Sequence, residues 1–429
     1  MSALRIGLAG LGVVGASVAA QLQQPLPRLQ GRFRLAAVCA RDQKKQRGLD
    51  VSGAQWFADA VALASSPDID VFVELIGGAE GPALAAVRAA LQSGKSVVTA
   101  NKAMLAAHGA ELAALAMQQG AKLEFEGAVA GGAPVVRGLR EGLAGAEIQS
   151  ITAILNGTSN FILTAMRNER REFRDALAQA QQLGFAEADP ALDVSGGDAA
   201  HKLAILCAIA FGGAPNPAGV RKAGLEQLSA LDIAYAERLG CCIKPLAKAH
   251  RTAAGVAAWT GPALAPLNHP LAVVDGAENA VLVEAPPIGR LSFTGPGAGG
   301  PATAAAVLSD LAALAEGRSH APFGRRSDHH ALPLADDPRR VSRWYMRLWV
   351  TDRPGTLAAV SAELGLVGVS IDSLHQDPSP RSGPLAPIFL TTQPIDRSAI
   401  AAAEASLAAL PVVAEQPLTL PIETALSAR

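Results

Sequence analysis

The sequence predicts an α/β protein: a parallel sheet comes first, an α+β region follows, and a ferredoxin-like domain ends the chain. Over the first 134 residues, short aliphatic strands alternate with helical segments, as in parallel sheets with crossover helices. After residue 342 the expected order is strand, helix, strand, strand, helix, strand, which is the ferredoxin-like order. The length of 429 residues suits about three domains.

Residues 1–134 are expected to form the first domain. Aliphatic runs predict its strands at 4–9, 35–40, 71–76, 96–99 and 123–125. Helices are expected between them at 16–23, 59–64 and 82–93.

Residues 135–317 are expected to form a second, α+β domain. The pattern predicts a strand at 151–155, helices at 161–167, 172–184 and 198–211, sheet over 244–293, and a last helix at 304–315. We expect that last helix to pack back on the first domain.

The third domain is expected at 343–429, after a linker at 318–342 that is basic, contains proline and lacks periodicity. Its strands are predicted at 343–351, 369–375, 387–392 and 412–420, and its helices at 355–365 and 397–410.

Composition excludes several classes of function. The formal charge is −1 and only 17 residues are aromatic, which disfavours a nucleic-acid partner. The longest apolar run, 203–211, is far shorter than the ~18 residues of a membrane span. The N-terminus lacks a signal-peptide pattern. The four cysteines form no C-x-x-C and the eight histidines show no zinc-ligand spacing, so we expect a cytoplasmic protein with reduced thiols and no zinc.

A glycine-rich loop, Gly10-Leu11-Gly12-Val13-Val14-Gly15, follows the first strand and opens a helix. This context makes G-x-G-x-x-G a dinucleotide-binding signal and the first domain Rossmann-type, although a simple strand-to-helix turn is the alternative. Arg41 stands where an acidic residue would bind an NAD ribose, so NADP is favoured, while Asp42 keeps NAD possible.

Two lysines among only nine stand out by position. Lys102 follows the strand at 96–99, at the edge where open α/β sheets bind ligands, although an ordinary surface lysine is the alternative. Asp198 and Lys202 are four residues apart on one largely apolar helix and can therefore meet. Because burial disfavours an ammonium, and two converging lysines disfavour each other's charge, we expect lowered lysine pKa values.

Seven segments together resemble homoserine dehydrogenase, in the long form that has a C-terminal ACT domain and no fused aspartokinase. They are GLAGLGVVG, VELIGG, TANKAML, FEGAVAGGAP, ILNGTSNFIL, GFAEADPALDVSGGDAAHK and GPGAGGPATAAAVLSDL, between residues 7 and 311. The family interconverts L-aspartate 4-semialdehyde and L-homoserine with NAD(P). The resemblance therefore implies an oxidoreductase of threonine and methionine biosynthesis.

The resemblance also implies roles for single residues. Lys202 is the implied proton donor, with Lys102 and Asp198 beside it; the implied substrate residues are Gly184, Glu187, Asp193 and Asp198. The implied cofactor residues are Gly10, Leu11, Gly12, Val13, Val14, Gly15, Arg41, Gly77, Gly78, Asn101, Lys102 and Gly299. A monovalent cation such as Na⁺ or K⁺ is implied at Glu126, Val129, Gly131 and Ala133, mainly through carbonyl oxygens. There, Gly127 and Ala128 replace the Ala-Ser or Ala-Thr often found in the family.

Residues 351–357 resemble the first loop of ACT domains, which sense amino acids. Threonine is the implied effector, and a purely structural or dimerising ACT domain is the alternative, since the insert at 377–384 is long and proline-rich. A homodimer or homotetramer is implied, with the middle domain serving both catalysis and dimerisation. Two alternatives to this function are an aspartate-semialdehyde dehydrogenase and an inactive amino-acid sensor. An aspartate-semialdehyde dehydrogenase needs a reactive cysteine in a loop after the sheet, and an inactive amino-acid sensor would not need the lysines and carboxylates.

Overall fold

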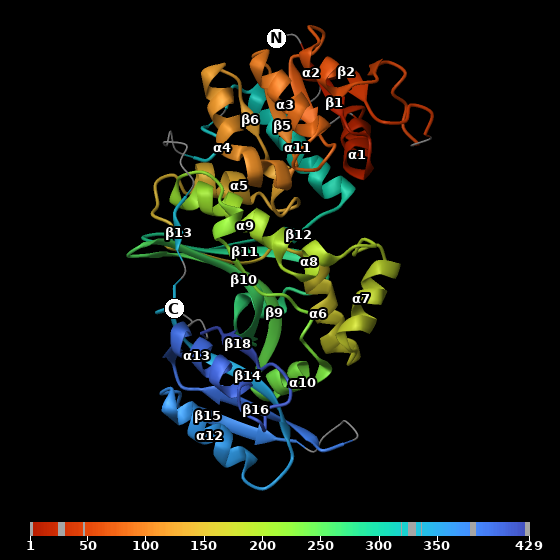
Figure 1. Ribbon diagram of the computed structural model, residues 1–429. Helices are drawn as coiled ribbons and strands as arrows, with labels where there is room; N and C mark the ends of the chain where they lie inside the picture. The colour runs from red at the N-terminus through yellow and green to blue at the C-terminus, as the bar shows by residue number, and fades with distance from the viewer. Residues whose placement is uncertain are drawn as a thin grey trace.

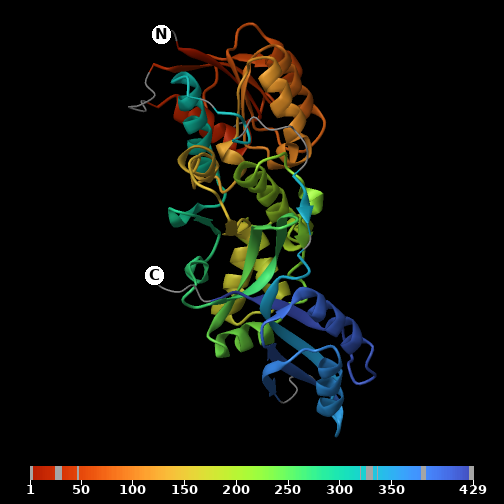
Figure 2. The same cartoon turned by 90° about the vertical axis from the view of Figure 1, so that its left-hand side faces the viewer.

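The computed structural model describes residues 3–24, 31–45, 48–318, 320–324, 332–335, 337–377 and 383–424. The N-terminal domain, the middle domain and the C-terminal domain follow one another along the long axis of the molecule (Figure 1). A view turned by 90° shows the same succession (Figure 2).

The N-terminal domain is a six-stranded sheet in the order β3-β2-β1-β4-β5-β6, with every strand pair parallel. Its strands are β1 (Leu4–Ala9), β2 (Phe33–Cys39), β3 (Gln55–Phe57), β4 (Val71–Glu74), β5 (Ser96–Thr99) and β6 (Leu123–Glu124). Its helices are α1 (Val13–Leu22), α2 (Ala60–Ser65), α3 (Pro82–Gln92) and α4 (Lys102–Gln118). Strand β3 and helix α4 were not predicted.

Alternate residues of the parallel strands face opposite layers of helices. Val71 and Val73 pack with residues of α1, whereas Phe72 between them packs with residues of α2, α3 and α4. Helix α4 lies between α3 and α9, and helices buried on more than one side carry no simple apolar stripe. This burial explains why its pattern did not predict a helix.

The middle domain is a sheet in the order β12-β11-β7-β9-β10, with adjacent strands antiparallel. The strands are β7 (Ser150–Ile154), β9 (Cys241–Thr252), β10 (Gly255–Pro266), β11 (Glu278–Ala285) and β12 (Gly289–Pro296), with β8 (Arg221–Lys222) beside β10. The helices are α5 (Val135–Arg137), α6 (Gly157–Glu169), α7 (Phe173–Gln182), α8 (Ala191–Val194), α9 (Gly197–Phe211) and α10 (Ala230–Arg238). Short helical turns lie at η1 (Glu126–Ala128), η2 (Gly138–Gly142), η3 (Pro217–Gly219) and η4 (Pro270–Val273).

Two helices join the first two domains. Helix α9 lies between α4 and the sheet of the middle domain and is buried along nearly its whole length (Figure 1). Helix α11 (Gly300–Ala315) follows β12 and returns to pack along α1, as expected from the sequence (Figure 1).

The expected linker lies partly outside the described residues, since 319, 325–331 and 336 are not among them. Within it, β13 (Leu334–Ala335) pairs with β10, and β14 begins at Val341.

The C-terminal domain has the expected ferredoxin-like order. Its elements are β14 (Val341–Thr351), α12 (Thr356–Leu366), β15 (Ile371–Gln376), β16 (Leu385–Thr392), β17 (Ile395–Asp396), α13 (Arg397–Ala408) and β18 (Leu418–Ile422). The last strand, predicted at 412–420, exists but its predicted start was wrong: Val413 makes only an isolated bridge to Val350, and the strand begins after Pro417. Proline has no N–H for a sheet hydrogen bond.

The sheet of the C-terminal domain continues that of the middle domain. The strand order runs β10-β18-β14-β16-β15, and Ile422 of β18 is paired with Leu264 of β10. One face of this sheet packs with α12 and α13. The other packs on α10, where the ring of Tyr235 stacks on Phe389 with centroids 4.8 Å apart.

Candidate active site

The loop Gly10–Gly15 leaves open space in front of α1. Gly10 has a φ of +97°, and a Cβ there would lie 2.3 Å from the carbonyl oxygen of Leu75. A Cβ on Gly15 would lie 1.8 Å from the Gly10 carbonyl oxygen, so the fold itself needs both glycines. Gly12 differs, because no described atom lies within 4 Å of a Cβ built there. The N–H groups of a helix start favour a phosphate group in such a space.

The chain beyond β4 is shaped by one buried carboxylate, Glu74. It accepts hydrogen bonds from the backbone N–H groups of Ile76 and Gly77, at 2.8 and 3.0 Å. Its second oxygen accepts from the hydroxyl of Thr99 at the end of β5, at 2.6 Å. Glu74 therefore connects the carboxyl ends of β4 and β5, two central strands of the sheet.

Asn101 positions the start of α4. Its side-chain oxygen accepts from Met104 N, which caps the helix, and its Nδ2 donates to the carbonyl of Gly78 at 2.7 Å. Lys102 follows as the first residue of the helix. The Gly77–Gly78 loop, Asn101 and Lys102 thus lie at one edge of the sheet, which is the position that the sequence predicts for Lys102.

One carboxylate brings the two lysines together. Asp198, in the first turn of α9, accepts from Lys102 Nζ at 2.8 Å with one oxygen and from Lys202 Nζ at 2.9 Å with the other. Lys202 is 7% exposed, and its Nζ also donates to the carbonyl of Leu155 at 2.7 Å. The predicted contact between Asp198 and Lys202 is confirmed, and Lys102 joins it from a different domain.

Asn156 connects this cluster to Asp193. Its Nδ2 lies 2.7 Å from Asp193 Oδ1 and 2.8 Å from Asp198 Oδ2, while its Oδ1 caps α6 by accepting from Ser159 N. The hydroxyl of Ser159 donates to the Asp193 carbonyl, which fixes the short helix α8 beside the cluster. Two carboxylates are therefore held close together beside two ammonium groups.

The expected lowering of the lysine pKa is wrong for Lys102. Burial alone would lower the pKa of Lys102, but the charge and hydrogen bond of Asp198, with the charges of Asp193 and Glu187, outweigh burial and raise it. Burial alone would raise the pKa of Asp198, but both lysines lower it. The pKa of Asp193 is raised by burial and by the nearby charge of Asp198. Attraction to the carboxylates thus outweighs burial at Lys102.

Gly184 and Glu187 lie at the outer side of the cluster. Both are exposed, on the segment that leads from α7 to α8. In the part of the chain that the structure describes, neither has a hydrogen bond or ion pair to Lys102, Lys202 or Asp198, and Glu187 acts on Lys102 only through its charge.

Arg41 and Asp42 follow β2, and both are exposed. Asp42 Oδ1 accepts from the backbone N–H groups of Lys44 and Lys45, at 2.8 and 3.2 Å, so this carboxylate closes a local turn. A cavity of about 420 Å³ lies between this turn and Leu11 of the glycine loop.

The loop before α11 returns to the glycine loop. Gly299 is the N-cap of α11, and a Cβ on Gly300 would lie 2.5 Å from Ser17 Oγ and 3.0 Å from Val13 Cγ1. Gly299 is thereby held beside the first turn of α1, although more than 280 residues separate them in sequence.

The four residues implied to bind a cation are all buried: Glu126, Val129, Gly131 and Ala133. Among the described residues, no hydrogen bond is donated to the carbonyl oxygens of Val129 or Gly131, whereas that of Ala133 accepts from Val135 N. Two unpartnered buried carbonyls are suitable donors for a hard monovalent cation.

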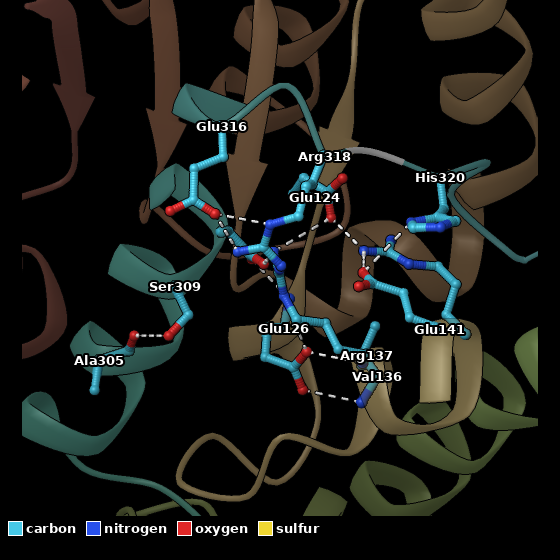
Figure 3. A network of polar contacts seen from close by, with 12 residues as sticks. Glu124, Glu126, Val136, Arg137, Glu141, Ala305, Ser309, Glu316, Arg318 and His320 are labelled. Carbon is cyan, nitrogen blue, oxygen red and sulfur yellow. Dashed lines mark hydrogen bonds and ion pairs between the residues drawn. The ribbon is translucent and has the colours of Figure 1, made fainter. Parts of the chain in front are cut away.

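The side chain of Glu126 holds this segment in place. Its two carboxylate oxygens accept from the backbone N–H groups of Val136 and Arg137, each at 2.9 Å (Figure 3). Its own backbone N–H donates to Asp310 of α11 at 2.8 Å, and Arg137 donates to the same carboxylate. The cation segment is thus fixed to α11.

Glu74 and Asn156 were not predicted as site residues. Both lie within segments that carried the resemblance, VELIGG and ILNGTSNFIL. Glu74 is the last residue of β4, and Asn156 lies two residues after the end of β7. That position is the signal that could have identified them.

Other kinds of site find no support within the described ranges. No group of three or more histidine, cysteine, aspartate or glutamate side chains could hold a metal ion there. No helix there is long and apolar enough to cross a membrane. All four cysteines are buried, and burial raises the pKa of each thiol. Buried thiols of raised pKa do not suit the cysteine chemistry of an aspartate-semialdehyde dehydrogenase.

A dinucleotide-binding sheet whose carboxyl edge borders a pair of lysines on one buried carboxylate defines the class of a nicotinamide-dependent oxidoreductase. Such a protein must bring a hydride donor and a proton donor to one carbonyl group.

Comparison with known proteins identifies the family. The family description "homoserine dehydrogenase" matches residues 134–312, its NAD-binding domain matches 10–126, and the ACT domain matches 344–409. The homoserine dehydrogenase of Neisseria gonorrhoeae is 40% identical over 432 residues, covering 98% of each chain. The chain belongs to the homoserine dehydrogenase family.

Solved structures agree with this assignment. A homoserine dehydrogenase from Thiobacillus denitrificans superposes with a TM-score of 0.88 at 37% identity, over 98% of each chain. A hyperthermophilic archaeal homoserine dehydrogenase in complex with NADPH has a TM-score of 0.62 at 27% identity, and the match covers 72% of this chain and 97% of the archaeal one.

Proposed function

We propose that this chain interconverts L-aspartate 4-semialdehyde and L-homoserine, with Lys202 as proton donor and acceptor. The hydrogen bonds of the Lys202 ammonium group are the observation that supports this role. An ammonium group has three N–H donors; one points to Asp198 and one to the Leu155 carbonyl. The third is free to meet the oxygen of an aldehyde.

The bound nicotinamide cofactor supplies the hydride that adds to the aldehyde carbon. Lys202 gives its proton to the oxygen on which negative charge develops, and the product is an alcohol. In the reverse direction neutral Lys202 accepts the hydroxyl proton. Asp198 supports both directions, because its two oxygens hold Lys102 and Lys202 in place.

The substrate amino acid would lie among Gly184, Glu187, Asp193 and Asp198. Glu187 and Asp193 offer carboxylates to its ammonium group, and Lys102 offers a cation at the border with the cofactor. The closeness of Asp193, Asp198 and Lys102 supports this arrangement.

Substitution of Lys202 tests the assignment. We expect Lys202→Ala to lower kcat by about 10²–10⁴-fold, the usual contribution of a positioned proton donor, with NADPH binding retained. Lys122→Ala, which removes an exposed lysine, is the control and should leave kcat unchanged. Wild-type turnover in Lys202→Ala would remove Lys202 from the mechanism. A wild-type protein that binds threonine but never oxidises NADPH with the semialdehyde would instead be an inactive sensor.

We propose NADP as the preferred cofactor, with NAD as the alternative. The proposed cofactor residues are Gly10, Leu11, Gly12, Val13, Val14, Gly15, Arg41, Gly77, Gly78, Asn101, Lys102 and Gly299. The local turn at Asp42 supports NADP, because one oxygen of this carboxylate already accepts two backbone N–H groups. Exposed Arg41 is suited to a 2′-phosphate.

The cofactor preference is tested by comparing kcat/KM for NADPH and NADH. Loss of a charge-assisted contact in Arg41→Ala should lower kcat/KM for NADPH by about ten- to a hundredfold and leave that for NADH unchanged. An unchanged ratio would remove Arg41 from the 2′-phosphate site.

We propose that Na⁺ or K⁺ binds the carbonyl oxygens of Glu126, Val129 and Gly131, with Ala133 as a further ligand. The unpartnered carbonyls of Val129 and Gly131 support this site. A bound cation stabilises the folded protein by mass action. The melting temperature should therefore rise in NaCl or KCl relative to tetramethylammonium chloride of equal ionic strength, and equal melting temperatures would argue against the site.

We also propose the division into domains at 1–134, 135–317 and 343–429, with threonine as effector at the ACT domain and a homodimer or homotetramer as the assembly. In the ACT loop, the hydroxyl of Thr356 donates to the carbonyl of Thr351, which closes the turn before α12. Most of the proline-rich insert, 378–382, lies outside the described residues. Turnover measured with and without threonine, and mass measured by light scattering, test these two proposals.

A further inference from the structure

Asn279 shares a hydrogen-bond acceptor with Lys202. It lies on β11 with no exposed surface, and its Nδ2 donates to the carbonyl oxygen of Leu155 at 3.1 Å. The same oxygen accepts from Lys202 Nζ at 2.7 Å. Leu155 follows β7, whose residue Ile154 is paired with Ala280, the neighbour of Asn279. Two side chains from different elements therefore meet at one carbonyl.

The other end of the Asn279 side chain faces the loop that carries Gly299. A Cβ on Gly297 would lie 2.2 Å from Asn279 Oδ1 and 2.4 Å from its Cγ. That Oδ1 atom is buried and has no hydrogen-bond partner in the described part of the chain. The Asn279 side chain thus lies between the Leu155 carbonyl and Gly297.

We infer that Asn279 is a positioning residue that sets the direction of the Lys202 ammonium group through the Leu155 carbonyl and relates it to the loop before α11. This inference rests on the proposed role of Lys202 as proton donor.

The physical reason is the limited capacity of a carbonyl oxygen, which has two lone pairs. Asn279 occupies one, so Lys202 is restricted to the other. Asp198 fixes a second N–H of Lys202. Because the Leu155 carbonyl and Asp198 fix two of the three N–H groups of Lys202, the third N–H can point in only one direction. Proton transfer requires such a fixed direction, because donor and acceptor must lie within hydrogen-bond reach. The close contact with Gly297 keeps Asn279 from swinging away from Leu155.

Asn279→Ala is the direct test. We expect kcat for semialdehyde reduction to fall by about ten- to a hundredfold, the size of effect that a small misplacement of a reacting group produces. The KM values for semialdehyde and NADPH should stay within about threefold of wild type, because Asn279 is not proposed to contact either molecule.

Asn160→Ala is the matched control. Asn160 is equally buried, its Nδ2 donates to the carbonyls of Val274 and Glu278 at 3.1 and 3.4 Å, and its Oδ1 also has no partner among the described residues. It contacts neither Leu155 nor Lys202 by any of these bonds. Asn160→Ala should match Asn279→Ala in lost stability but keep kcat near wild type. Equal kcat losses in the two variants would overturn the inference.

Gly297→Ala changes the other partner of the contact between Gly297 and Asn279. This variant replaces Asn279→Ala as the test if Asn279→Ala does not fold. The added Cβ must displace the Asn279 side chain, so we expect the same loss of kcat with Asn279 still present.

A double-mutant cycle with Lys202→Ala separates this inference from the proposed function. If Asn279 acts through Lys202, Asn279→Ala should not lower further the residual rate of Lys202→Ala. A full additional loss in that background would overturn the positioning role while leaving Lys202 as proton donor. Wild-type turnover in Lys202→Ala would instead overturn the proposed function itself.

Discussion

Lys102 and Asp198 form an ion pair across the boundary between the N-terminal and middle domains, with 2.8 Å between ammonium nitrogen and carboxylate oxygen. Lys102 is the first residue of α4, where the helix dipole disfavours a positive charge. Asp198 is in the first turn of α9, where the dipole favours a negative one. The pair therefore offsets an unfavourable charge at α4 and connects the two domains at the proposed site.

Asp198→Asn should lower the pKa of Lys102. Burial lowers that pKa in the wild type and Asp198 is the main opposing influence, so removing its charge leaves burial dominant. The rate at which an acylating reagent labels Lys102, followed by mass spectrometry against pH, should rise at lower pH than in the wild type. Exposed Lys122 in the same digest is the control, and unchanged labelling of Lys102 would contradict the electrostatic account. We expect kcat/KM to fall by at least about a hundredfold.

Gly12→Ala should weaken cofactor binding without destabilising the fold. A Cβ at Gly12 meets no described atom within 4 Å, so we expect a melting temperature within about 2 °C of wild type. The methyl group would occupy the proposed phosphate space and should raise the KM for NADPH by at least about tenfold, or about 1.4 kcal/mol.

Gly15→Ala is the contrasting variant. Its Cβ would lie 1.8 Å from a backbone oxygen, so it should destabilise the fold by about 1–3 kcal/mol or more. An unchanged KM for NADPH in Gly12→Ala would place the phosphate elsewhere.

Asp310→Asn should change how stability depends on pH. Burial, with the charges of Glu124 and Glu126, raises the pKa of Asp310 to about 7 against the pull of Arg137. The unfolded chain loses this proton near its ordinary pKa of 3.8 and the folded protein near 7, so wild-type stability falls as pH rises between these values. The slope is about 1.4 kcal/mol per pH unit for one proton.

Asparagine cannot ionise, so the melting temperature of Asp310→Asn relative to wild type should increase from pH 5 to 7 and level off above pH 7. Glu316→Gln is the control, because neighbouring arginines lower the pKa of exposed Glu316 and it stays ionised over this range (Figure 3). If the difference in melting temperature between Asp310→Asn and wild type did not change from pH 5 to 7, Asp310 would be ionised over that whole range.

Asp232→Ala should weaken the junction between the middle and C-terminal domains. Asp232 of α10 is fully buried and accepts from Tyr345 Oη at 2.6 Å and from Arg347, both on β14. Its loss leaves the Arg347 guanidinium buried without that partner, at a cost of about 3–5 kcal/mol. Denaturant unfolding measures the loss. Asp372→Ala removes the more exposed pair with Arg343 and should cost less than about 1 kcal/mol. Equal losses of unfolding free energy in Asp232→Ala and Asp372→Ala would show that burial does not decide the strength of the junction.

The features that the sequence predicted correctly are carried by local patterns of residues. The strand–turn–helix unit around Gly10–Gly15 and the contact between Asp198 and Lys202 both follow from residues close in sequence. A turn or a helix face brings such residues together whatever the rest of the chain does. The alternation of strands and helices likewise predicted the class of each domain.

Other features depend on residues far apart in the chain, and these were missed or wrongly expected. Helix α4 has no apolar stripe, because it is packed between two other helices. The sign of the Lys102 pKa shift could not be predicted without knowing that Asp198 lies against it.

The sequence by itself thus determined the domain classes, the cofactor loop and the resemblance to a family, since these are carried by local spacing and by the residues themselves. Only the tertiary structure decided that one carboxylate serves two lysines, that β18 continues the middle sheet, and that Asn279 meets Lys202 at the Leu155 carbonyl. The physical reason is that charge and hydrogen-bond effects depend on distances of a few ångströms, and no spacing in the sequence specifies such distances between separate elements.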